Sequence, residues 1–397
     1  TLGFSTSSVP NKKVSVVSLK VTEVTEDVTT TRAPPRTGIA QTLLNMALAS
    51  PLWRYVMVPQ ARKTMASTAI ANNIPFYEAK KWLEFQIQSD IADPPESLSS
   101  LKIPSYYQQA FHAYETGNLS WEAAMEVEIV SCAVGARNFP QAGSLGEETF
   151  RGAFSSALDE AGATVPQGGR ILDMGCGTGM STRRLAIKYP KASEIVGVDL
   201  SPYFIAVGKR LLELAPASFH NGGPWVCDVA SDSRIQYLVG DAANSLDLEE
   251  IEECSFDTVN IGLVIHELPP EVAIDMVDEA FQLLKPQGQL WISEMDFEAP
   301  AYAAQRANPL LFSLIRATEP YLDDYAESIS SLFAHVQSKF EHVRVVPATG
   351  RHFALIATKG TEALDTEKNG RMEDLRFDAD GSYRIKDTHL QLWENKQ

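Results

Sequence analysis

From about residue 148 to residue 359, short apolar segments alternate with stretches of helical patterning. The apolar segments are "RILDMG", "EIVGVDL", "IQYLVGD", "FDTVNIGLV" and "GQLWISEMD". Repeated strand–helix alternation implies a mostly parallel sheet with helices on both faces, because neighbouring parallel strands need a crossover connection. Two later segments, "HVRVVPAT" and "RHFALIATK", are joined by Gly350 and predict a closing hairpin. We therefore expect an α/β fold in this half of the chain.

The first of these strands leads into a glycine-rich turn, "ILDMGCGTGMSTRRLA". Asp173 ends the strand, and Gly175, Gly177 and Gly179 allow a tight turn into a helix that begins near residues 178–181. Glycine lets a ligand approach the backbone where a Cβ atom would block it. The N-terminus of the helix favours a carboxylate or a phosphate. A plain strand–helix connection can have the same turn, so the turn alone does not define a ligand.

The next two strands also end in carboxylates. Asp199 lies twenty residues after Gly179 and can accept hydrogen bonds from both hydroxyls of a ribose; helix capping is an alternative that can coexist with this role. Asp241 can accept a bond from an adenine amino group, the Ala242 backbone can contact the ring edge, and Leu200 can pack on the ring face. Ligands of open α/β sheets bind at the carboxyl ends of strands. The three strand ends therefore predict a nucleoside pocket.

The order "ILDMGCGTG", "VGVDLS", "VGDAA" and "LLKPQGQLWISEMD" makes residues 148–359 resemble a class I S-adenosylmethionine-dependent methyltransferase of the type that acts on small molecules. The resemblance implies a Rossmann-like, seven-stranded sheet with its last strand antiparallel. It also implies S-adenosyl-L-methionine as the cofactor. A nicotinamide-dependent oxidoreductase is disfavoured, because Met180 stands where the dinucleotide motif requires Gly or Ala.

Carried over to matching positions, the resemblance implies cofactor-binding roles for Asp173, Gly175, Gly177, Asp199 and Asp241. The methionine carboxylate of the cofactor would suit the helix N-terminus after the glycine turn. Asp173 would then pair with the methionine amino group, directly or through water.

The methyl acceptor is expected at the same edge of the sheet. His266, in "GLVIHELPPE", follows the fourth strand and can act as a general base; packing over the cofactor or bonding a backbone group are equal alternatives. Glu294, Tyr302 and His352 are further candidate acceptor contacts. No His, Asp and Glu cluster has metal-ligand spacing, so no metal is expected.

Four segments are expected along the chain: an extended leader over 1–36, a helical accessory region over 37–147, the methyltransferase domain over 148–359 and a polar, acidic extension over 360–397. In the accessory region the apolar spacing of "QTLLNMALAS" is helical. Pro51 is placed to begin a new helix, and Ser120 is a candidate N-cap. This region and the tail are where a protein partner would bind.

The charge of the chain is acidic and unevenly distributed. The net charge is −17, which argues against a nucleic-acid partner. No apolar run reaches the roughly 18–20 residues of a transmembrane helix. Residues 1–66, however, hold eight basic and three acidic side chains, and the first 37 residues contain thirteen Ser or Thr.

This bias at the N-terminus predicts an organelle-targeting remnant, with the chloroplast favoured over the mitochondrion; a disordered tail on a cytoplasmic protein is the alternative. The four cysteines, Cys132, Cys176, Cys227 and Cys254, include no CxxC pair, so neither a zinc site nor a disulfide framework is indicated. A reducing compartment fits this pattern.

From these observations we predict an enzyme that transfers a methyl group from S-adenosyl-L-methionine to a small-molecule acceptor, with hydrophobic metabolites among the candidates. The alternative is a methyltransferase-fold protein that serves as a structural or interaction subunit of a larger, organellar assembly. An intact cofactor pocket favours the enzyme, although a fold alone does not define a function.

Overall fold

The computed structural model describes residues 51–87, 95, 101–112, 114–214, 232–300, 302, 318–361, 370–372, 374–378 and 383–385. The centre of the described structure is an eight-stranded mixed sheet with the order β3-β2-β1-β4-β5-β7-β6-β8. Its strands are β1 (Arg170–Met174), β2 (Glu194–Asp199), β3 (Ile235–Val239), β4 (Phe256–Gly262), β5 (Leu284–Met295), β6 (His342–Pro347), β7 (His352–Thr358) and β8 (Arg371–Met372).

The sheet is mostly parallel, as predicted. Strands β1 to β5 run parallel to one another, and β7 is antiparallel to both β5 and β6. The β6–β7 pair confirms the closing hairpin. The sheet has one strand more than the expected seven, because the two-residue strand β8 from the C-terminal extension pairs with β6 at the sheet edge. The order reverses between β1 and β4, so the connections that leave their carboxyl ends run to opposite sides and leave room for a ligand.

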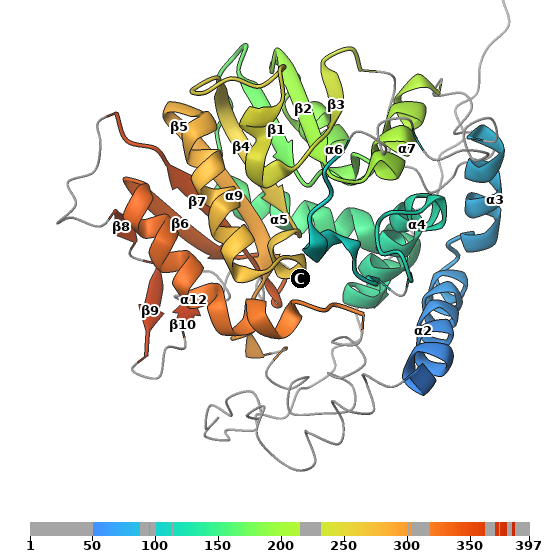
Figure 1. Cartoon of the computed structure of the whole chain (residues 1–397). Helices are drawn as coiled ribbons and strands as arrows, with labels where there is room; N and C mark the ends of the chain where they lie inside the picture. Colours follow the sequence, from blue (N-terminus) through green and yellow to red (C-terminus); the bar gives the residue numbers. More distant parts are fainter. Residues whose placement is uncertain are drawn as a thin grey trace, which may run out of the picture.

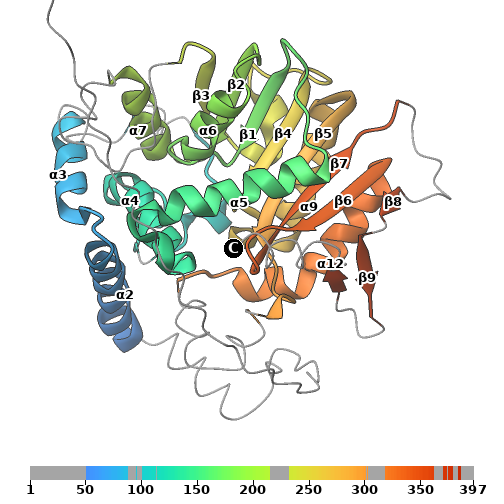
Figure 2. The ribbon, with the colours of Figure 1, turned by 180° about the vertical axis from the view of Figure 1, so that it is seen from behind.

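Helices cover both faces of the sheet. Helices α9 (Pro270–Leu283) and α12 (Leu322–Lys339) lie over one face, in front of the sheet in Figure 1. Helices α5 (Gly146–Ala161) and α6 (Met180–Lys188) pack on the other face, where Figure 2 shows α5 crossing the strands. Helix α9 illustrates the cause: Ala273, Met276, Val277 and Ala280 are three or four residues apart and are all buried against the strands.

The accessory region is helical, as predicted, over its described part. It contains α2 (Pro51–Ala71), α3 (Phe76–Gln86), η2 (Ser105–Gln108), α4 (Trp121–Asn138) and η3 (Pro140–Leu145). Pro51 begins α2, and the Ser120 side chain accepts a hydrogen bond from the Ala123 N–H at 3.2 Å as the N-cap of α4. The buried side chains of α3 and α4 share one apolar cluster with Tyr203 and Phe204 of α7 (Pro202–Glu213), so the region packs directly on the sheet domain.

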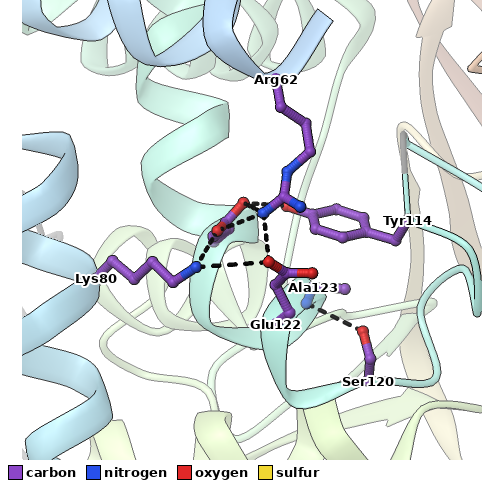
Figure 3. Close-up of polar contacts among 7 residues, drawn as sticks. Arg62, Lys80, Tyr114, Ser120, Glu122 and Ala123 are labelled. Atoms are coloured by element: carbon purple, nitrogen blue, oxygen red, sulfur yellow. Dashed lines mark hydrogen bonds and ion pairs between the residues drawn. The ribbon is translucent and has the colours of Figure 1, made fainter. Parts of the chain in front are cut away.

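One buried carboxylate of α4 binds groups from three other parts of the accessory region; Figure 3 labels these groups, Arg62, Lys80 and Tyr114. Glu126 of α4 is 3% exposed and accepts hydrogen bonds from Arg62 of α2 at 2.8 Å, Lys80 of α3 at 2.5 Å and the Tyr114 hydroxyl at 2.7 Å. Arg62 also lies over the Tyr114 ring. Burial disfavours the Glu126 charge, but these donors outweigh it and lower the pKa of the carboxyl. We call these four residues the Glu126 cluster.

The described part of the C-terminal extension packs on the domain. Besides β8 it forms a hairpin of β9 (Leu375–Phe377) and β10 (Tyr383–Ile385). Tyr383 is 1% exposed, contacts Phe333 of α12 and donates a hydrogen bond from its hydroxyl to Asp296 at 2.9 Å. The predicted leader over 1–36, and the tail after residue 385, lie outside the described residues.

Candidate functional site

A cavity of about 1100 Å³ opens at the carboxyl ends of the parallel strands. The glycine turn after β1, the ends of β2 and β3, and the segment after β4 supply its domain-side wall. The accessory region supplies the opposite wall from α2, α4 and η2. The site is therefore formed jointly by the methyltransferase-like sheet and the helices that precede it in the chain.

The three glycines of the turn have left-handed backbone angles for different reasons. A Cβ atom on Gly175 (φ +72°) would lie 2.7 Å from the Val264 side chain, and one on Gly179 (φ +87°) would lie 1.8 Å from the Tyr237 hydroxyl. Packing against neighbouring protein atoms therefore excludes a side chain at both positions. On Gly177 (φ +57°) the nearest atom to such a Cβ would be 3.9 Å away, so this part of the turn is open to the cavity.

Asp173 lies behind the cavity wall and binds protein groups. Its carboxylate accepts hydrogen bonds from the Ser181 and Thr182 hydroxyls at 2.8 and 2.6 Å and from the Asn260 amide at 2.7 Å. It is 1% exposed and is not among the residues that line the cavity. Asp173 thus ties the end of β1 to the start of α6 and to β4.

Asp199 lies on the cavity wall and is bound by three protein donors. Its carboxylate accepts bonds from the Gly177 N–H at 2.9 Å, the Ser201 N–H at 2.8 Å and the Tyr107 hydroxyl of η2 at 3.2 Å. Burial raises the pKa of Asp199, although these three donors oppose the rise. Ser201 itself caps α7 by accepting a bond from the Phe204 N–H. A carboxylate has about four acceptor positions, so Asp199 keeps capacity for a ligand hydroxyl.

Asp241 and its neighbours form the wall at the end of β3. Asp241 accepts bonds from the Ala243 N–H at 3.0 Å and the Asn244 amide at 2.9 Å, which caps the short helix η4 (Ala242–Asp247). Leu200 and Ala242 line the same wall and are buried. Carboxylates at the ends of β2 and β3, with apolar surface between them and an open glycine turn, fit an adenosine carrying an amino-acid chain.

His266 faces the cavity from the short helix η5 (Ile265–Glu267) after β4. Its Nδ1 atom lies 2.8 and 3.0 Å from the two carboxylate oxygens of Glu294 on β5, and its Nε2 atom lies 3.9 Å from Glu267. Glu294 has no exposed surface and lies behind His266. Burial opposes the charge on the ring, but Glu294, Glu267 and the nearby Glu319 outweigh it and raise the pKa of His266 to about 10.

Further titratable groups meet at the same end of the cavity. His112 lies 3.0 Å from Glu319 and 3.4 Å from Glu267 through its Nε2 atom. Burial opposes its protonation, but these two carboxylates raise the pKa of His112 to about 9. Burial raises the pKa of Glu267 to about 7, against the effect of the two histidines. Two histidines and three carboxylates thus meet here: His112, His266, Glu267, Glu294 and Glu319.

Tyr302 and His352 also line this end of the cavity. His352 begins β7, contacts the rings of Phe150, Phe154 and Tyr302, and lies 2.6 Å from the Thr349 hydroxyl through Nδ1. Burial lowers the pKa of His352 to about 3, so this ring is neutral near pH 7.

The structure brings most of the expected site residues to one cavity and leaves a few behind its wall. The residues that line it are Gly175, Gly177, Asp199, Leu200, Asp241, Ala242, His266, Tyr302 and His352. Asp173, Gly179 and Glu294 are not among the lining residues. Residues of the accessory region that the sequence did not single out are on the opposite wall: Tyr106, Tyr107, His112 and Glu128. The aromatic run "SYYQQAFHAY" is the one local signal for this wall.

Two further findings concern the described residues alone. Within them, no group of three or more His, Cys, Asp or Glu side chains is arranged to hold a metal ion. No helix in the described ranges is both long and apolar enough to cross a membrane.

Three features together define a class I S-adenosylmethionine-dependent methyltransferase fold. They are a mostly parallel sheet with an antiparallel β7, a glycine turn after β1, and carboxylates at the ends of β2 and β3. Residues 171–288 match the family model of the methyltransferase domain. These residues form a methyltransferase domain of this class.

Sequence relatives share part of the chain. The human mitochondrial citrate synthase-lysine N-methyltransferase is 31% identical over 153 residues, which cover 36% of this chain and 58% of that protein. A ubiquinone biosynthesis O-methyltransferase of Xylella fastidiosa is 29% identical over 169 residues, covering 42% of this chain and 59% of that protein. The match thus spans less than two thirds of either relative. The crystal structure of human N-acetylserotonin methyltransferase with S-adenosylmethionine aligns at 16% identity with a TM-score of 0.39, covering 74% of this chain and 70% of that one.

Proposed function

We propose that this protein binds S-adenosyl-L-methionine and transfers its methyl group to a hydroxyl of a small, largely apolar acceptor. The observation that carries the proposal is that His266, held by Glu294, lines the same cavity as Gly177 and Asp199. A cofactor wall and a group that can bind the acceptor oxygen therefore share one enclosed space. The volume of about 1100 Å³ leaves room for an acceptor beside the cofactor.

The cofactor, when bound, supplies an electrophilic methyl group. Asp199 would hold one ribose hydroxyl, Asp241 and the Ala242 backbone the adenine edge, and Leu200 the ring face. The N-terminus of α6 would bind the carboxylate of the amino-acid chain. Apart from the second ribose hydroxyl, these are the roles that the sequence predicts.

His266 would bind the acceptor oxygen while the acceptor loses its proton. Because Nδ1 faces Glu294, the other ring nitrogen, Nε2, faces the cavity. A pKa of about 10 means that the free ring is protonated near pH 7, so it can stabilise an acceptor oxygen that becomes an anion. The same value matches that of a phenol, about 10, so a phenol that has released its proton to solvent can share the ring proton of His266. A phenolic or similarly acidic hydroxyl is the acceptor that this pairing favours.

The apolar part of the cavity wall favours a hydrophobic acceptor body. The accessory region and the sheet domain contribute apolar side chains to it, among them Phe76, Val127, Val130, Met276, Met295 and Leu322. The name of the Xylella relative, a ubiquinone biosynthesis O-methyltransferase, agrees with an oxygen acceptor. Placement in an organelle remains part of the proposal; the hydroxyl-rich, basic N-terminus and the mitochondrial name of the human relative support it.

Two measurements test the proposal. Calorimetric titration of the full chain should show binding of S-adenosylmethionine and S-adenosylhomocysteine. A panel of phenols should then release S-adenosylhomocysteine from S-adenosylmethionine, and His266→Gln should lower turnover by about 10²–10⁴-fold while cofactor affinity stays within about twofold. His335→Gln, on α12 and paired with Asp278, is the matched control. A native chain that binds neither nucleoside would reject the enzyme and promote the structural-subunit alternative.

A further inference from the structure

Glu128 of α4 reaches from the accessory region to the glycine turn. Its Oε1 atom accepts hydrogen bonds from the Thr178 hydroxyl at 2.7 Å and from Arg183 Nη2 of α6 at 2.7 Å. Arg183 also donates to the Thr178 carbonyl at 3.0 Å and has no exposed surface. One oxygen of the carboxylate is therefore fully used in holding α4 against the turn.

The other oxygen of Glu128 is different. Its Oε2 atom has no hydrogen-bond partner within the described ranges. The atom is buried, and the whole residue is only 4% exposed. Glu128 is also one of the residues that line the cavity, beside Gly177 and Thr178. A buried carboxylate oxygen without a donor is unfavourable, and a cationic donor from a ligand relieves that cost best.

We propose that Glu128 binds the amino group of the amino-acid chain of the cofactor. The inference rests on the proposed function, namely that the cavity takes S-adenosylmethionine. An amino acid carries an ammonium group next to its carboxylate, so a site for it needs an anionic group near an anion-binding element. The N-terminus of α6 is the anion-binding element, and Glu128 contacts Thr178 immediately before it.

Asp173, which the sequence assigns to this amino group, is less well placed. It is behind the wall, and three protein donors already bind it. Glu128 lines the wall, and its buried Oε2 atom accepts no hydrogen bond from any described residue. The accessory region would thus complete the cofactor site of the sheet domain, in addition to forming the acceptor wall.

The chain contains a matched control for this inference. Glu147 of α5 is also a buried carboxylate, accepts bonds from Ser131 and Arg151 through Oε1, and likewise has an Oε2 atom without a partner among the described residues. It does not line the cavity. Any effect of an altered buried carboxylate on folding should appear in both Glu147→Gln and Glu128→Gln, whereas an effect on the ligand amine should appear in Glu128→Gln alone.

The test compares two ligands by calorimetry: S-adenosylhomocysteine and its analogue without the α-amino group. The native chain should bind S-adenosylhomocysteine at least about tenfold more tightly than the analogue, as expected for a charged hydrogen bond. Glu128→Gln keeps the size and one acceptor oxygen, and it should reduce this preference to within about twofold without changing the affinity for the analogue. Glu147→Gln and Asp173→Asn should keep the preference.

The outcomes separate the two proposals. A native chain that binds neither ligand rejects the proposed function. A native chain that binds both equally overturns the role of Glu128, and this result needs no variant to fold. A loss of the preference in Asp173→Asn, or an equal loss of affinity for both ligands in Glu128→Gln, also overturns it, because the amine is then bound by Asp173 or Glu128 is purely structural.

Discussion

The Nδ1 atom of His266 lies 2.8 Å from Oε1 of Glu294, and no part of Glu294 reaches solvent. The pair links η5, which follows β4, to strand β5. Strands β4 and β5 are neighbours in the sheet. Because the carboxylate is buried, its charge is poorly screened, and it fixes both the orientation and the charge of the ring. This relationship determines how the site should respond to pH and to substitution.

Glu294→Gln should lower the pKa of His266 from about 10 to below about 8. Glutamine keeps the size and the acceptor of Glu294, but the negative charge that outweighs burial is lost. Titration of the His266 ring by NMR measures the change. An unaltered pKa in the variant would mean that Glu267 and Glu319 alone hold the proton.

The stability of the native chain should fall as pH rises from about 6.5 to about 10. The pKa of His266 is raised to about 10 in the folded state, so its contribution is complete below the unfolded value near 6.5 and is lost as pH passes through the folded value. His112, with a pKa of about 9, acts in the same direction. Urea unfolding at pH 6, 8 and 10 measures the slope.

The matched comparison for this slope is a pair of histidine variants. His266→Gln should flatten the decline, while the same change at the exposed His342 of β6 should leave it as in the native chain. Equal slopes in the native chain and in His266→Gln contradict the assignment.

Asp199→Ala should weaken binding of S-adenosylhomocysteine by about 1.5–3 kcal/mol, because a charged hydrogen bond to the ribose is lost. It should also lower the melting temperature, since the Gly177 and Ser201 N–H groups lose their acceptor. Tyr107→Phe removes one donor to Asp199 without altering the carboxylate and serves as the control. Calorimetry measures the affinity of both variants for S-adenosylhomocysteine. Full affinity in Asp199→Ala would show that this residue does not bind the cofactor.

Glu126→Gln should destabilise the accessory region by about 1–3 kcal/mol, because the partly buried Arg62 and Lys80 side chains lose the buried one of their two anionic partners. Glu122 is on the same helix and contacts the same two cations but is 49% exposed, so Glu122→Gln should cost less than about 1 kcal/mol. Urea unfolding measures both. Equal losses would show that burial of Glu126 adds nothing to the Glu126 cluster.

Local sequence patterns predict the fold well because they are repeated and short in range. Strand–helix alternation predicts the parallel sheet, and Gly350 predicts the β6–β7 hairpin. The helix start at Pro51 and the N-cap at Ser120 are confirmed for the same reason, since capping involves residues only a few positions apart. Strand β8 escapes prediction because two residues have no detectable period and pair only once β6 is in place.

The candidate site divides in the same way. The domain-side wall can be predicted from local patterns, because the glycine turn, Asp199 and Asp241 follow strands whose carboxyl ends must meet at one edge of a parallel sheet. Folding alone determines which residues face them, since Tyr107, His112 and Glu128 come from two helices and a turn far away in the chain and carry no motif. It also decided the partner of His266, because the charge of a histidine depends on neighbours that packing alone brings within a few ångströms.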